Sequence, residues 1–132
     1  MAHTTAKDFA YLSDLHYEHR LWRNELNFYK EELNILQERL GEIVSKNTHN
    51  EVEAGVESFQ NRFDLQRDHI SDIKHRIKKH EHMLAGFAKD HPIAVDHVHF
   101  TDHAAIREDF EHFRELYREM KDQFNHFAVK WL

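Results

Sequence analysis

The sequence predicts an all-α fold: an antiparallel (up-down-up) three-helix bundle with long coiled-coil-like helices. Three observations predict it. Apolar residues recur at alternating steps of three and four through three long stretches, which is typical of helices packed side by side. Only 3 Gly and 1 Pro interrupt 132 residues, whereas all-β folds need many turn residues. Charged residues make up 32%, which suits helices that each expose a wide solvated face.

The first predicted helix covers about residues 5–46. Its heptad ladder is apolar except at His19, and it reads Leu12, Leu15, His19, Trp22, Leu26, Tyr29, Leu33, Leu36, Leu40 and Ile43. A short link around Asn47 follows. Because so short a link cannot span the length of a helix, we expect the first two helices to be antiparallel neighbours.

The second predicted helix covers about residues 49–90. Thr48 and Glu51 fit a capping box at its start, and Pro92 disfavours a helical residue before it at the end. Gln66 and His80 are the polar members of its ladder. The ladder reads Val52, Val56, Phe59, Phe63, Gln66, Ile70, Ile73, Ile77, His80, Leu84 and Phe87.

The third predicted helix covers about residues 102–131, after a His-rich connector of about residues 91–101. Its ladder is wholly apolar and reads Ile106, Phe110, Phe113, Tyr117, Met120, Phe124, Phe127 and Trp131. We expect one helical-bundle domain over residues 1–132. The layout resembles a spectrin-type three-helix bundle, Trp22 included, and this resemblance implies the fold alone.

Three glutamates recur every seven residues on the first helix, and three basic residues recur so on the second. In one antiparallel register Glu18, Glu25 and Glu32 face Arg76, His69 and Arg62. The plainer interpretation is a row of interhelical ion pairs beside the core. The alternative is a metal site formed by Glu25, Glu32 and His69, because these glutamates lie within a wide apolar face.

A similar alignment places His19 and His80 in one layer of the bundle. With Gln66 they form a predicted buried polar layer, whose first interpretation is a hydrogen-bonded structural layer. A pH-sensing layer and a metal-binding pair are the alternatives. A second apolar line on the first helix, Leu21, Phe28 and Ile35, predicts either contact with the third helix or a homodimer interface.

Histidine is the unusual residue of this composition, because protonating all 14 would reverse the formal net charge of −6. His97, His99 and His103 gather in and after the connector. In extended backbone, His97 and His99 would point to one face, and imidazoles so spaced chelate zinc, nickel or copper. Polar loop and capping roles are the plainer interpretation of these residues.

Several classes of function are disfavoured. The chain has no Cys, no phosphate-cradling Gly-rich loop and no catalytic motif, so we expect no enzyme and no cofactor. A net charge of −6 disfavours nucleic acid, and no apolar run suits a signal peptide or a membrane span. We expect a cytoplasmic structural or protein-interaction module that can self-associate. A metal-binding or metal-buffering protein is the alternative, and a pH-responsive bundle ranks lower.

Overall fold

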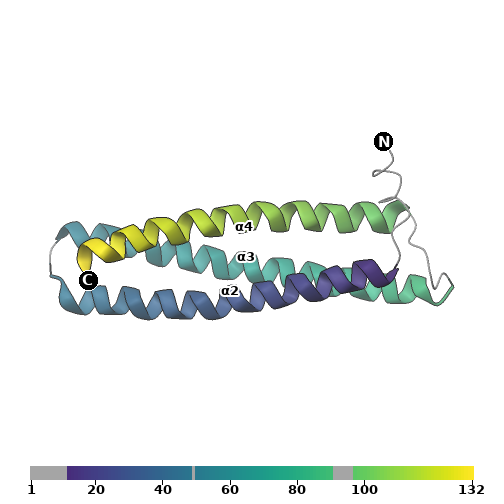
Figure 1. The fold of residues 1–132 in the computed structure, drawn as a ribbon, viewed down its shortest axis with the longest axis horizontal. Helices are drawn as coiled ribbons and strands as arrows, with labels where there is room; N and C mark the ends of the chain where they lie inside the picture. The colour runs from purple at the N-terminus through teal and green to yellow at the C-terminus, as the bar shows by residue number, and fades with distance from the viewer. Residues whose placement is uncertain (1–11, 49, 91–96) are drawn as a thin grey trace. The chain divides into compact units, whose positions relative to one another are not determined.

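The fold was analysed in a computed structural model that describes residues 12–48, 50–90 and 97–132, without the side chains of residues 97 and 98. These residues form three helices and no strand: α2 (Leu12–Lys46), α3 (Asn50–Ala88) and α4 (His97–Trp131) (Figure 1). The prediction of an all-α three-helix bundle is confirmed. The first residues of the predicted first helix, 5–11, lie outside the described part of the chain.

The contacts divide the chain into two compact units. Unit 1 comprises the described residues of Met1–Leu26 with Asp72–Glu111, and unit 2 comprises Asn27–Ser71 with those of His112–Leu132. Each unit contains a stretch of all three helices, so each has its own three-helix interior.

The helix directions follow from contacts inside each unit. In unit 1, His16 of α2 contacts Glu81 of α3, and His19 contacts His80, so α3 runs opposite to α2. In unit 2, Tyr29 packs on Phe113 of α4, and Asn47 donates a hydrogen bond to the Trp131 carbonyl. Since both numbers rise together, α4 runs in the direction of α2, as the up-down-up prediction requires.

The interior of unit 2 is aromatic. Phe63, Phe113 and Phe124 are at most 1% exposed, and the rings of Phe63 and Phe124 meet edge to face with centroids 5.2 Å apart. Such pairs contribute about 0.5–1.5 kcal/mol beyond the burial of their area. Gly55 lies against Phe127, whose Cε1 would be 2.3 Å from a Cβ at that position. Only glycine therefore allows α4 to approach α3 this closely without moving the ring.

The start of α4 differs from the prediction. The sequence predicted a connector over about residues 91–101 and a helix from about residue 102, but α4 begins earlier, at His97. The reason is packing: Phe100 lies on the buried pair Leu15 and Leu84, while His103, one turn later, is fully buried. A spacing of three puts both side chains on one face of a helix, whereas a strand would turn them to opposite faces.

The second apolar line of α2 is on the surface. Leu21, Phe28 and Ile35 are 47%, 56% and 60% exposed, so the third helix does not bury them. The homodimer alternative stays a prediction. None of the described helices holds an apolar stretch sufficient to cross a bilayer.

Candidate metal centre

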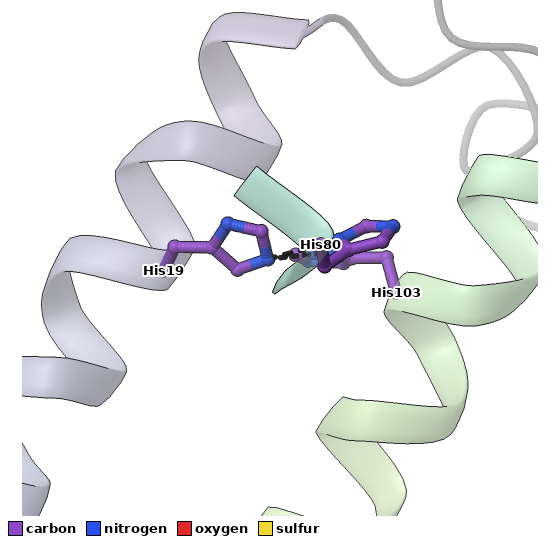
Figure 2. Close-up of side chains that lie close together, drawn as sticks. All are labelled: His19, His80 and His103. Atoms are coloured by element: carbon purple, nitrogen blue, oxygen red, sulfur yellow. Dashed lines mark hydrogen bonds between the residues drawn. The ribbon is translucent and has the colours of Figure 1, made fainter. Parts of the chain in front are cut away.

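Three histidines from three helices meet in the interior of unit 1. His19 comes from α2, His80 from α3 and His103 from α4, and they are 0%, 3% and 0% exposed (Figure 2). Each stands at a core position of its helix, flanked one turn away by buried apolar residues such as Trp22, Ile77 and Ile106. The heptad pattern therefore points all three rings inward. We call these residues the triad.

The rings approach one another through nitrogen atoms. His19 Nε2 is 3.2 Å from His80 Nδ1 and 3.1 Å from His103 Nδ1. One ring nitrogen of each residue lies within 4.8 Å of the others. In a tetrahedral zinc site with Zn–N bonds of about 2.0–2.1 Å, two nitrogen ligands are about 3.3 Å apart. Two of the three nitrogen spacings in the triad are thus already close to those of a tetrahedral metal site, and the third lies within 4.8 Å.

The outer nitrogen of each ring has an oxygen partner. His19 Nδ1 donates to Glu81 Oε1 at 2.5 Å, and His103 Nε2 donates to Glu18 Oε1 at 2.6 Å. His80 Nε2 donates to the main-chain carbonyl of His99 at 3.1 Å. Carboxylate and carbonyl oxygens only accept, so these outer nitrogens carry the proton. When all three rings are neutral, the inner nitrogens are then the unprotonated ones, available to a metal ion.

Both carboxylates are held in the charged form. Burial raises the pKa of Glu18, but hydrogen bonds from His103 and Arg107 outweigh burial and hold the pKa at about 2. The Arg107 guanidinium lies 2.6 Å from Glu18 Oε1. Burial also acts to raise the pKa of Glu81, and hydrogen bonds from His19 and His16 lower it overall. Carboxylates behind ligand histidines fix the tautomer and the ring orientation and increase ligand basicity.

Two members of the triad, His19 and His80, resist protonation. Burial lowers the pKa of His19 to about 4, although the hydrogen bond to Glu81 partly opposes this. Burial, followed by the charge of His103, lowers the pKa of His80. Because only the unprotonated nitrogen binds a metal, these shifts keep ligands available at a pH where exposed histidines begin to protonate.

Aromatic and aliphatic side chains enclose the triad. The Trp22 ring stacks on His103 with centroids 4.8 Å apart and planes at 22°, and it also contacts the ring of Phe110. Leu15 and Leu84, 2% and 4% exposed, form a buried apolar pair in the same unit. Such packing locks ring orientations and excludes water, which strengthens polar interactions inside the site.

A second group of ligand-type side chains shares His80. His80, His99 and Asp102 place one ligand atom each within 4.8 Å of one another. Among the described residues, this group and the triad are the two that meet the spacing of a metal site, and neither includes Glu25, Glu32 or His69. Of the predicted connector ligands, His99 belongs to the second group and His103 to the triad. The side chain of His97 lies outside the description.

The predicted ion pairs have other partners. Glu18 binds Arg107 and His103 of α4, while Arg76 of α3 pairs with Asp109. This corrects the predicted pairing of Glu18 with Arg76, and the reason is that the glutamate side of α2 faces α4. Glu25 is half-buried.

The same correction holds in unit 2. Glu32 accepts hydrogen bonds from Tyr117 and Lys121 of α4 rather than from Arg62, which bonds Gln123. His69 is exposed and meets the Phe113 ring edge-on. Gln66, the third member of the predicted polar layer, is 8% exposed and belongs to unit 2, apart from the triad.

One member of the triad, His103, was not predicted to lie with the other two. His19 and His80 were placed in one layer, but His103 was assigned to the connector. A signal was present: the ladder of the third helix, continued backward from Ile106 by three residues, reaches His103. Comparison with known proteins adds no further signal. The chain matches no protein-family model, and no curated protein or solved structure is significantly similar to it.

Proposed function

We propose that this chain binds a divalent transition metal ion of the zinc class through His19, His80 and His103. The observation that carries the proposal is the convergence of three ring nitrogens, one from each helix, whose outer partners already fix each ring. With the proton of each neutral ring on its outer nitrogen, the inner nitrogens are three acceptors, and a cation that binds all three satisfies them together.

The donor set selects the class of metal. Imidazole nitrogen suits zinc, copper and nickel, whereas magnesium and calcium require oxygen ligands. The nearby carboxylates of Glu18 and Glu81 point their oxygens at histidine N–H groups, so they serve as outer partners of ligands. We therefore expect little affinity for magnesium or calcium at the triad.

Metal binding at this site has a structural consequence. The triad takes one ligand from each helix of unit 1, so one ion links α2, α3 and α4. Because the ligands come together only in the folded chain, bound metal stabilises the fold. A free metal concentration of about 100 times the dissociation constant contributes about 2.7 kcal/mol.

The test is calorimetry with Zn²⁺ on the untagged protein, followed by the visible absorption of Co²⁺ in the same site. We expect His80→Ala and His103→Ala to weaken binding by at least about 10–100-fold. The matched control is His82→Ala, which removes an exposed histidine of the same helix as His80. Binding that survives the triad substitutions and falls with exposed histidines would instead indicate surface buffering.

A second candidate function is a protein-interaction module. Three apolar side chains of unit 2, Phe28, Ile35 and Leu65, are 56%, 60% and 62% exposed. Exposed apolar side chains of this size are favourable contacts in interfaces. Light scattering tests self-association: a mass above that of one chain, lowered by Phe28→Ser with Ile35→Ser, supports it. A single-chain mass at every concentration contradicts it.

A further inference from the structure

One face of unit 1 gives access to the triad. A pocket of about 360 Å³ opens between α3 and α4, and its walls include Lys79, His80 and Asp102. His80 is the triad member that lines this pocket, whereas His19 and His103 are fully enclosed. The His80 ring therefore stands between the pocket and the inner nitrogens, with its Nδ1 on the inner side.

The second ligand group extends from the surface to this ring. Asp102 is exposed, His99 is half-buried and His80 is buried, and one ligand atom of each lies within 4.8 Å of the others. The outer nitrogen of His80 is the one on this side, since Nε2 bonds the His99 carbonyl at 3.1 Å. Two nitrogens and a carboxylate at this spacing are ligands that zinc and copper accept.

We propose that His80, His99 and Asp102 form a loading site, at which a divalent transition metal binds first before it passes inward to the triad. This inference rests on the proposed function, and it assigns the route by which the metal reaches the triad. The metal binds Asp102 and the His99 ring at the surface and reaches His80 through Nε2. Rotation of the His80 ring and exchange of ligands then transfer it to the inner nitrogens.

In this transfer, the His80 ring loses one proton and gains one. While Nε2 holds the metal at the loading site, the ring proton is on Nδ1, where it donates to His19 Nε2 across the 3.2 Å contact. When Nδ1 takes the metal in the triad, that proton leaves through solvent and Nε2 is protonated again. Nε2–H then donates to the His99 carbonyl, as in the structure. The ring stays neutral throughout, and no oxidant or reductant is needed.

The test is the rate of Co²⁺ uptake by the full chain, followed by stopped-flow absorption. We expect His99→Ala with Asp102→Asn to slow uptake roughly tenfold or more, because the charge and the first ligands of the route are lost. Release into chelator should slow by the same factor, so the Co²⁺ affinity at equilibrium stays within about threefold of the parent.

The matched control removes the same residue types from another part of α4. Asp122→Asn with His126→Ala changes two exposed residues of unit 2 and should leave the uptake rate as in the parent. Circular dichroism checks that both double variants remain helical. If the loading-site variant takes up Co²⁺ at the parental rate, or loses affinity through faster release alone, the loading site is wrong.

This outcome is distinct from failure of the triad itself. If the parent protein binds no Co²⁺, or if His103→Ala leaves binding intact, then the proposed metal centre fails. If the parent binds Co²⁺ through the triad and the loading-site variant is as fast, only the route fails. The two proposals are thereby tested by different measurements.

Discussion

The two units use the same heptad scaffold but treat buried polar groups in opposite ways. In unit 2, the buried Tyr117 hydroxyl donates to Glu32 Oε1 at 2.7 Å, and Lys121 Nζ donates to Glu32 Oε2 at 2.8 Å. In unit 1, the outer bonds of the triad leave three ring nitrogens facing one another. A donor meets an acceptor in the first case, whereas ring nitrogen meets ring nitrogen in the second.

This difference distinguishes a structural network from the proposed metal centre. The network around Tyr117 is satisfied by the chain alone, which is the usual condition of buried polar groups. The triad is satisfied toward its outside, and its inner nitrogens face one another. Gln66 is a lesser exception in unit 2, because its buried Oε1 has no hydrogen-bond partner among the described residues.

The largest expected effect is a loss of stability when the aromatic interior of unit 2 is changed. Phe63→Ala should lower the free energy of unfolding by about 3–5 kcal/mol, because it leaves a cavity against Phe59 and Phe124. Urea unfolding followed by circular dichroism at pH 7.5 measures the loss. Since Phe63 has no part in the triad, the loss should be equal in chelator and in Zn²⁺. A loss that depends on Zn²⁺ would contradict the separation of the two interiors.

The second expected effect is acid sensitivity of the metal-free protein. Burial lowers the pKa of His19 to about 4 from 6.5, so the folded state resists protonation that the unfolded chain accepts. The stability is therefore complete above pH 6.5 and falls as the pH drops from 6.5 toward 4. The loss is on the order of 3 kcal/mol, and the lowered pKa of His80 acts in the same direction.

Urea unfolding in chelator, between pH 7.5 and pH 4.5, checks this effect. His19→Leu should flatten the profile, because a leucine has no proton to gain and fills a similar volume. Glu18 adds its own loss only below pH 4.5, since its pKa falls to about 2 in the fold. A flat profile in the parent protein would mean that the fold does not lower the pKa of His19.

Much of the fold could be predicted from sequence, because burial follows a period. Ladder positions such as Leu26, Ile77 and Phe110 are at most 5% exposed, and an apolar residue every 3.5 positions identifies them without knowledge of partners. The layer that joins His19 and His80 followed from one antiparallel alignment. Two helices joined by a short link have little freedom of register, which is why this part of the site was accessible.

The residues that α4 contacts could not be predicted from sequence in the same way. Heptads fix which residues face inward, but they do not fix whether the third helix packs to one side or the other of the first two. Glu18 and Glu32 therefore had two possible sets of partners, and the structure assigns them to α4. The place of His103 in the triad was missed because the third helix was predicted to start at about residue 102, and His103 was grouped with the connector histidines, whereas α4 begins at His97.

A smaller effect is expected at the paired polar network of unit 2. Tyr117→Phe removes one hydroxyl donor and leaves Glu32 bonded to Lys121, so we expect a loss of about 1 kcal/mol. Burial, with the hydrogen bond to Glu32, raises the pKa of Tyr117, so its phenol should stay neutral in the fold at alkaline pH. Tyrosinate absorbance during a base titration compares the parent with the variant. Metal affinity should be unchanged, and a lowered affinity would link the network to the triad.

The smallest effect is expected at the surface of unit 1, where it decides between two registers. Arg76 and Asp109 are 34% and 56% exposed, so their ion pair should contribute about 0.2–1 kcal/mol. A double-mutant cycle of Arg76→Gln with Asp109→Asn should give a coupling of that size, which added salt reduces. The cycle of Arg76→Gln with Glu18→Gln should give none, because Glu18 is bound to Arg107. A reversal of these couplings would mean that Glu18 faces α3. His103 would then lack its outer partner, and nothing would fix the tautomer on which the proposed centre depends.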